Sequence, residues 1–169
     1  MIDIKKINSL DKSDFLSIFG NVFEKSKWIS EKAFDLKPFE SLESFISKIL
    51  GIYENSDNKT ILEILNLHPE LAIEKKLTAN SEAEQIKANL KECTPEEFNE
   101  FKRLNNDFKS KFNLPFIYAV RGKTKKDILN EFISRLKSDN IEQELDKSLI
   151  QVKKIATLRI NEIITDEKI

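Results

Sequence analysis

Glycine and proline are scarce in this chain of 169 residues, which contains three glycines and four prolines. A β-sandwich or β-barrel needs a turn about every 8–12 residues, and turns depend heavily on these two residue types. Lysine, glutamate, leucine and isoleucine are abundant instead, and they favour helices or fill helical apolar stripes. The composition therefore predicts an all-α protein, and we expect one compact multi-helix domain over residues 1–169.

Cysteine and histidine each occur once, as Cys93 and His68. One cysteine excludes an intramolecular disulfide framework and any zinc site with several cysteines. One histidine excludes every site that needs two imidazoles. The sequence also lacks a glycine-rich phosphate loop, a G-x-S-x-G motif and an H-E-x-x-H motif. The sequence therefore contains none of the motifs that usually indicate nucleotide binding, serine hydrolysis or zinc proteolysis.

A charge excess of either sign is also missing, because 28 Lys and Arg residues face 29 Asp and Glu residues. This balance predicts neither a nucleic-acid partner nor an anionic membrane surface as a partner. No apolar run approaches the roughly 20 residues of a membrane helix. The first ten residues lack the apolar stretch of a secretory signal. We expect a soluble, cytoplasmic protein.

Apolar residues recur with helical spacing along most of the chain. Thr94-Pro95-Glu96-Glu97 is a strong helix start, with Thr as N-cap, Pro at the first helical position and Glu three residues after the cap. The short apolar run 116–120 is consistent with an extended segment or a buried turn. We expect seven or so helices, over 13–24, from Ser41, over 60–67 with Asn58 or Asp57 as cap, from Ser81, after Thr94, from Thr124 to about 137, and over 142–164.

Three places could carry chemistry. His68 precedes a proline, which disfavours the helical conformation and predicts that His68 leaves its helix. Its imidazole can exchange protons near neutrality, although interaction with the helix dipole is the more common role for a histidine there. Ser81 and Glu84 fit a capping box, or a helix start suited to an anionic ligand. Arg159 faces inward, and it needs a carboxylate partner from protein or ligand unless its stem reaches solvent.

Two other features favour structural roles. Cys93 lies just before a helix cap, where a thiol pKa can be lowered, but a half-buried structural cysteine is the more common case. The aromatic stripe Phe98, Phe101, Phe108 and Phe112, on the same helix face as Asn105, lacks the basic residues that RNA-binding surfaces interleave with aromatics. The stripe is therefore expected to belong to the core.

Together, several segments resemble the 2-oxo-4-hydroxy-4-carboxy-5-ureidoimidazoline (OHCU) decarboxylase family. The resemblance covers nearly the whole chain, and the order and spacing of its pieces make it specific. The matching pieces are Phe19-Gly20-Asn21-Val22-Phe23-Glu24 with Ser26 and Trp28-Ile29, His68-Pro69-Glu70-Leu71-Ala72, Ser81-Glu82-Ala83-Glu84-Gln85, Leu104-Asn105, the run 111–122 and Ile155-Ala156-Thr157-Leu158-Arg159.

The resemblance implies an all-α decarboxylase that needs no cofactor or metal and is usually a homodimer. It implies that His68 donates the proton, that Glu84 orients or deprotonates the hydroxyl region of the substrate, and that Arg159 supplies positive charge to this small anionic ureidoimidazoline. The implied substrate-binding residues are Pro69, Ser81, Glu82, Ala83, Gln85, Phe116, Ile117, Tyr118, Ala119 and Val120. Their implied product is (S)-allantoin, in urate degradation within purine catabolism.

The sequence departs from the family pattern at four positions. Ile73, Asn89 and Asn113 stand where the family usually has glycine, and Phe108 stands where it has tyrosine. A residue other than glycine disfavours positive φ, so these changes predict shifted loops. Two alternatives also stay open: a non-catalytic helical interaction module, and a decarboxylase of the same fold with another small ureido or imidazole acid as substrate.

Overall fold

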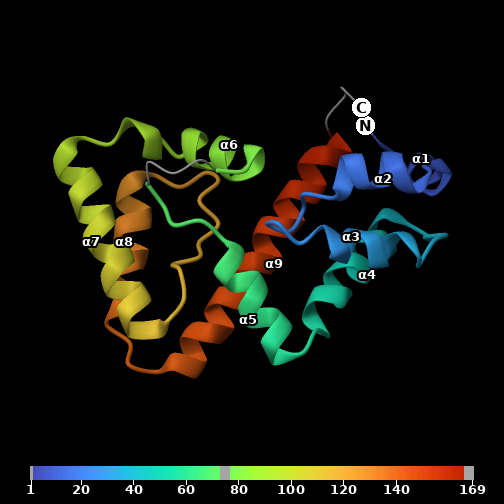
Figure 1. The fold of residues 1–169 in the computed structure, drawn as a ribbon. Coiled ribbons are helices and arrows are strands. Elements are labelled where there is room, and N and C mark those ends of the chain that lie inside the picture. The colour runs from blue at the N-terminus through green and yellow to red at the C-terminus, as the bar shows by residue number, and fades with distance from the viewer. Residues whose placement is uncertain (1, 73–76, 166–169) are drawn as a thin grey trace. The chain divides into compact units, whose positions relative to one another are not determined.

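The computed structural model describes residues 2–72 and 77–165, and Ile73 lies outside this part of the chain. The described residues form nine α-helices and one 3₁₀ turn and contain no strand (Figure 1), which confirms the all-α prediction. The elements are α1 (Ile4–Ser9), α2 (Lys12–Phe19), α3 (Lys27–Phe34), α4 (Leu42–Glu54), α5 (Asn58–Leu67), α6 (Ala79–Lys87), η1 (Leu90–Glu92), α7 (Pro95–Phe112), α8 (Lys125–Leu136) and α9 (Ile141–Thr165).

Contacts divide the chain into two compact units. The first unit combines the residues up to Ile64 with those from Lys153 onward, and the second is the continuous segment Leu65–Val152. Helices α5 and α9 therefore each begin in one unit and end in the other. This division is not apparent from the sequence, because the sequence contains no linker rich in glycine, proline or serine.

The first unit shows where the expected helix 13–24 actually ends. Helix α2 stops at Phe19, and Gly20 follows as its C-cap. A Cβ at position 20 would lie 2.3 Å from the Leu16 carbonyl oxygen, so this position requires glycine. The Ser30 hydroxyl, on α3, donates a 2.7 Å hydrogen bond to the Phe19 carbonyl at the end of α2. The predicted boundary was wrong because glycine and asparagine at 20 and 21 are poor helix formers.

Phenylalanine rings fill the core of this unit. Phe15 and Phe19 on α2 both contact Phe45 on α4, with ring centroids 6.0 and 4.9 Å apart. Phe34, from α3, contacts Phe15 at 5.4 Å. Helix α3 itself was not predicted, and neither was α1. At six residues, α1 is too short to show a clear apolar period, and the buried face of α3 includes the polar Ser30 between Ile29 and Ala33.

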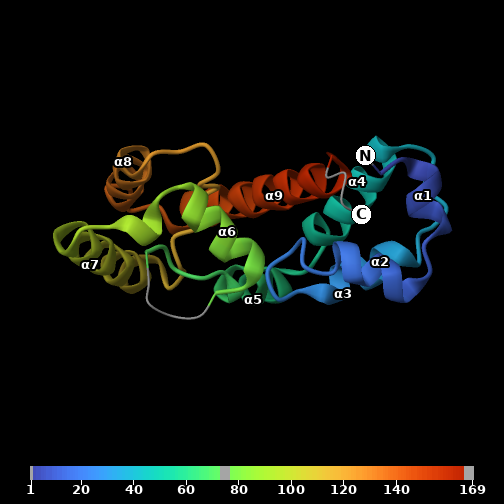
Figure 2. The same ribbon diagram turned by 90° about the horizontal axis from the view of Figure 1, so that it is seen from above.

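In the second unit, α7 and α8 begin as their sequences predict. Thr94 and Thr124 are the N-caps, and each forms a reciprocal capping box with the residue three positions later, Glu97 or Asp127. Helices α7 and α8 lie side by side in both ribbon views (Figures 1 and 2). Their shared core is aromatic and includes contacts among Phe108, Phe112, Phe116 and Phe132. Phe101, Phe108 and Phe112 of the aromatic stripe are buried in the core, as expected, whereas Phe98 is half-buried.

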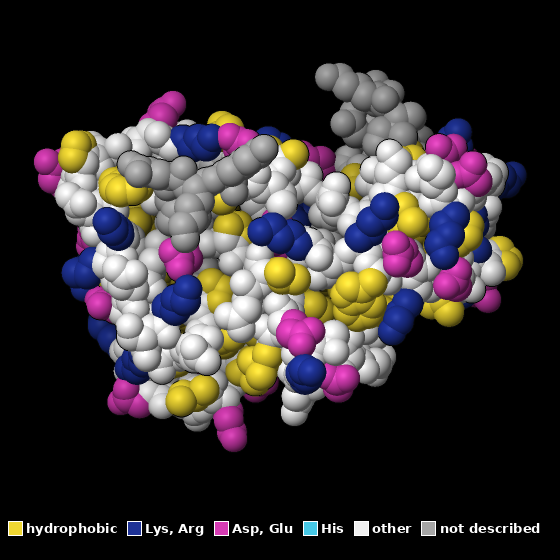
Figure 3. Space-filling view, in the orientation of Figure 1, with side chains coloured by type: hydrophobic (Ala, Val, Ile, Leu, Met, Phe, Trp, Pro, Cys, Tyr) yellow, Lys and Arg dark blue, Asp and Glu magenta, His cyan; other side chains and the backbone are white. Residues whose placement is uncertain are grey.

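Charged side chains of both signs are interspersed on the face of the molecule drawn in Figure 3. That face carries no broad patch of one sign, in keeping with the balanced composition. None of the helices in the described residues is both long enough and apolar enough to cross a membrane.

Candidate active site

His68 lies immediately after the last residue of α5, as the following proline predicts. Its backbone N–H still donates to the Leu65 carbonyl at 3.2 Å, so the residue is tied to the helix end. Asp57 rather than Asn58 caps the start of α5, with its Oδ1 accepting a 2.8 Å hydrogen bond from the Thr60 N–H. The His68 side chain is only 7% exposed. The single imidazole is therefore held in a nearly closed environment in the second unit.

Two amide side chains hold the turn that follows His68. The Gln85 Oε1 accepts from the Ala72 N–H at 3.0 Å, and its Nε2 donates to the Glu70 carbonyl at 3.1 Å. The buried Asn105 donates from Nδ2 to the Leu71 carbonyl at 2.9 Å. Ala72 itself has a positive φ of 52°, an uncommon conformation that such contacts stabilise. These bonds bring the turn after His68 together with α6 and α7.

Helix α6 begins earlier than the capping-box motif predicted. Thr78 is the N-cap, and its side chain accepts from the Ser81 N–H, so Ser81 lies inside the first turn. The prediction of a helix start and capping box at Ser81 is therefore wrong. Thr78 can cap equally well, and a Ser-x-x-Glu pattern is not confined to helix starts. Glu84 and Gln85 consequently lie in the second turn of α6, away from the free N–H groups of its N-terminus.

The other candidates on α6 differ in exposure. Ser81 and Gln85 are buried, Glu84 is half-buried and Ala83 is exposed. Glu82 is half-buried and forms an ion pair with Lys91. The Gln85 amide is engaged with the turn after His68, so the structure gives it a role in holding that turn.

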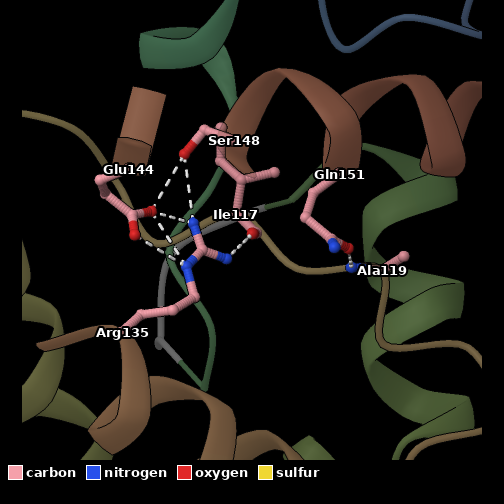
Figure 4. A network of polar contacts seen from close by, with 6 residues as sticks. All are labelled: Ile117, Ala119, Arg135, Glu144, Ser148 and Gln151. Atoms are coloured by element: carbon pink, nitrogen blue, oxygen red, sulfur yellow. Dashed lines mark hydrogen bonds and ion pairs between the residues drawn. The ribbon is translucent and has the colours of Figure 1, made fainter. Parts of the chain in front are cut away.

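The segment 116–120 has no regular secondary structure, and its backbone forms hydrogen bonds with side chains of α8 and α9 (Figure 4). The Arg135 Nη1 donates to the Ile117 carbonyl at 2.7 Å. The Gln151 Oε1 accepts from the Ala119 N–H at 3.0 Å. All of these residues belong to the second unit. The Ala119 N–H is thus already engaged. Among the implied substrate-binding residues 116–120, backbone N–H groups that could bind a ligand are therefore to be found on the other four.

Arg135 is part of a buried ionic network that the sequence analysis missed. The guanidinium is 2% exposed and binds the Glu144 carboxylate through Nε, at 2.9 and 3.2 Å, and through Nη2. Nη2 also donates to the Ser148 hydroxyl at 3.2 Å. The guanidinium carbon lies 4.6 Å from the centroid of the Phe116 ring. A sequence signal did exist, since Arg135 follows the buried Ile128 and Phe132 at helical spacing.

Arg159 faces inward as predicted, but it belongs to the first unit. Its Nη1 lies 3.3 Å from the Glu24 Oε2 and 3.3 Å from the Val22 carbonyl. Both side chains are buried, so Arg159 has a carboxylate partner from the protein and its stem does not reach for solvent. Its predicted role toward a substrate rests on the family resemblance alone.

Cys93 has the properties of a structural thiol. Its Sγ donates to the Leu90 carbonyl at 3.2 Å, and burial, opposed by the nearby Lys125, raises the pKa of the thiol. The lowered pKa considered from its place before the Thr94 cap is therefore absent.

We accordingly expect Cys93 to react with iodoacetamide at pH 7.5 more slowly than the same cysteine in the urea-unfolded chain. A raised pKa means that less thiolate is present at neutral pH, and the thiolate is the nucleophile. Mass spectrometry of timed aliquots measures both rates. Faster alkylation in the folded protein would contradict the structural role.

Asparagine replaces glycine at two turns without disturbing them. Asn89 precedes η1 and has a φ of 56°, and Asn113 ends α7 with a φ of 54°. Asparagine tolerates this left-handed region better than other residues with a Cβ. Because asparagine adopts a positive φ at both positions, these two departures from glycine do not require the loops to shift.

Within residues 2–72 and 77–165, no group of three or more His, Cys, Asp or Glu side chains could hold a metal ion.

The sequence is similar to those of several named proteins. The chain is 37% identical over 163 residues to the uric acid degradation bifunctional protein of Bacillus sp. strain TB-90, covering 96% of this chain and 32% of that protein. It is 30% identical over 166 residues to the 2-oxo-4-hydroxy-4-carboxy-5-ureidoimidazoline decarboxylase of Haloferax volcanii, covering 98% of both chains. The chain thus spans about a third of the length of the Bacillus relative.

A solved structure is also similar. The crystal structure of an (S)-allantoin synthase superposes with a TM-score of 0.74 at 25% identity, covering 96% of this chain and 54% of that chain. The sequence pattern of the family described as OHCU decarboxylase matches residues 8–161, across both compact units. On this match, the chain belongs to the OHCU decarboxylase family.

Proposed function

We propose that this protein is a carboxy-lyase that converts 2-oxo-4-hydroxy-4-carboxy-5-ureidoimidazoline to (S)-allantoin in urate degradation. The observation that carries the proposal is the buried, solitary His68, which is followed directly by a turn that Gln85 of α6 holds by two hydrogen bonds. Family membership and the names of the relatives support the substrate and product. The half-buried Glu84 precedes Gln85 on the same helix.

The chemistry suits these residue types. Breaking the bond to the carboxylate carbon releases carbon dioxide and leaves its electron pair on the ring carbon. The adjacent imine or carbonyl of the ring delocalises that pair, so the substrate supplies its own electron sink and the proposed reaction uses no metal or cofactor. The hydroxyl group on that carbon then loses its proton and becomes a carbonyl, while the neighbouring ring carbon, which bears the ureido group, takes one proton on one face. The protein has to orient the carboxylate, stabilise the developing charge and deliver that proton.

Each candidate residue has a proposed part in this reaction. His68 donates the proton to the ring carbon that bears the ureido group, because imidazole is the side chain that exchanges protons most readily near neutral pH. Glu84 accepts from the hydroxyl group of the substrate and orients it. Pro69 and the backbone of 116–120 form part of the ring site. Arg159 contributes positive charge, a role for which the family resemblance is the support.

The test is a turnover assay with substrate generated freshly from urate. Ultraviolet absorption follows loss of the substrate, and circular dichroism follows the appearance of dextrorotatory allantoin. We expect the protein to accelerate both signals without added metal, whereas heat-inactivated protein leaves the spontaneous rate unchanged. Equal rates with and without active protein would overturn the proposal. Turnover of a different ureido or imidazole acid, tested in parallel, would instead support a decarboxylase of other specificity.

Two further expectations concern the oligomeric state, for which the family resemblance is the support, and the compartment. We propose that it works as a homodimer in the cytoplasm. Sedimentation velocity of the purified protein tests the dimer, and cell fractionation tests the compartment.

A further inference from the structure

The two edges of the segment 116–120 are used differently. The Ile117 carbonyl and the Ala119 N–H, two residues apart, both face the side chains of α8 and α9 (Figure 4). In an extended chain, the polar groups of alternate residues point to the same side, and those of the residues between them point to the opposite side. The groups of Tyr118 and Val120 therefore face away from Arg135 and Gln151.

That second edge has free donors. The Val120 carbonyl accepts from the Lys123 N–H at 2.9 Å. The Tyr118 and Val120 N–H groups, however, donate no hydrogen bond to any residue in the described part of the chain. Val120 is buried and Tyr118 is half-buried. Because the N–H group of a buried residue is costly to leave without an acceptor, that of Val120 calls for one from outside the described chain, and that of the half-buried Tyr118 lies on the same edge.

The engaged edge is held rigidly. Arg135 cannot swing away from Ile117 without also leaving Glu144 and Ser148, which fix its other nitrogen atoms. Its guanidinium also lies 4.6 Å from the ring centroid of Phe116, at the start of the same segment. Gln151 adds a second point of attachment, one turn of α9 beyond Ser148. The segment is thus fixed by two side chains on one edge only.

We propose that Arg135 and Gln151 are positioning residues, which hold the segment 116–120 so that the Tyr118 and Val120 N–H groups meet the ring carbonyl of the substrate. This inference rests on the proposed function, because it takes the segment as part of the ring site. The bound carbonyl accepts hydrogen bonds, and those bonds strengthen as negative charge spreads to it during loss of carbon dioxide. The substrate thereby supplies an acceptor for both N–H groups.

Isosteric variants of Gln151 test the proposal. Gln151→Met keeps the size of the side chain and removes its acceptor for the Ala119 N–H, whereas Gln151→Glu keeps an acceptor. We expect kcat/KM to fall about two- to tenfold in Gln151→Met and to stay within about twofold of wild type in Gln151→Glu. Gln143→Met, the same change at an exposed position of α9, is the matched control and should leave kcat/KM unchanged. The double variant Arg135→Met with Glu144→Leu should lose roughly tenfold or more.

Amide hydrogen exchange gives a readout without substrate. The Ala119 N–H should exchange slowly in wild type and in Gln143→Met, and faster in Gln151→Met, while the melting temperature changes little. Unchanged exchange at Ala119 would overturn the attachment, and equal kcat/KM in wild type and Gln151→Met would overturn its role in positioning. Equal losses in the Met and Glu variants would also overturn it. Absence of turnover in wild type would instead refute the proposed function. The exchange rate at Ala119 would still show whether Gln151 holds the segment 116–120.

Discussion

Replacing His68 with asparagine is expected to lower the kcat of decarboxylation by about 10²- to 10⁴-fold, the usual contribution of a positioned acid or base. Asparagine occupies a similar volume and retains hydrogen-bonding groups, but it cannot donate a proton near neutral pH. The assay is the absorption and circular-dichroism measurement described above, carried out at saturating substrate. KM should change much less than kcat, because the proton moves in the chemical step.

The control for this variant is its stability. His68 lies after the end of α5 and its backbone bond to Leu65 does not depend on the side chain, so the helix content and melting temperature should stay near those of wild type. Since His68 is the only histidine, its imidazole gives a single pair of ring proton resonances, and their pH titration can be compared with the pH profile of kcat. Near-wild-type turnover by the asparagine variant would show that another group donates the proton.

Replacing Arg135 alone with methionine is expected to lower the free energy of unfolding by about 3–5 kcal/mol. The change leaves the Glu144 carboxylate, only 1% exposed, without its cationic partner. The double variant Arg135→Met with Glu144→Leu removes both charges and fills their space with apolar groups. Because such replacements are often close to neutral, the double variant should lie within about 2 kcal/mol of wild type.

Urea denaturation followed by circular dichroism measures these differences. The matched control is Arg103→Met, which removes an ion pair to Asp107 on α7 whose side chains are 62% and 49% exposed. This exposed pair should contribute less than about 1 kcal/mol. A single Arg135 variant as stable as the Arg103 variant would mean that the buried network adds little to the fold. A double variant as unstable as the single one would assign the loss to the hydrogen bonds of Arg135 rather than to the uncompensated charge.

The parts of the fold that local sequence predicts are those whose ends are fixed by local hydrogen bonds. Ser41, Thr94 and Thr124 cap α4, α7 and α8 as expected, because an N-cap and the residues that it binds are adjacent in sequence. The start of α6 was misplaced because two hydroxyl residues, Thr78 and Ser81, compete for the same role. Only packing against the rest of the unit decides between them.

The sequence predicts which residue types form the candidate site, but it predicts few of the contacts between them. The proline after His68 indicated the helix exit, and the structure confirms it. The engagement of Gln85 with Glu70 and Ala72 joins residues 13 to 15 positions apart, and no periodic pattern reports such a contact. The attachment of Ile117 to Arg135 likewise depends on how α8 packs beside the segment. Long-range polar contacts of this kind follow from the tertiary structure.

The division of the chain into units sets an order for its synthesis on the ribosome. The second unit is one continuous stretch, Leu65–Val152, and all of its residues have been made before the last part of α9 is translated. The first unit draws on both ends of the chain: Glu54 pairs with Lys153, and the Ile2 N–H bonds to the Ile164 carbonyl. Its N-terminal helices cannot complete these contacts until residues 153–164 have left the exit tunnel, and their phenylalanines are exposed to chaperones during that delay.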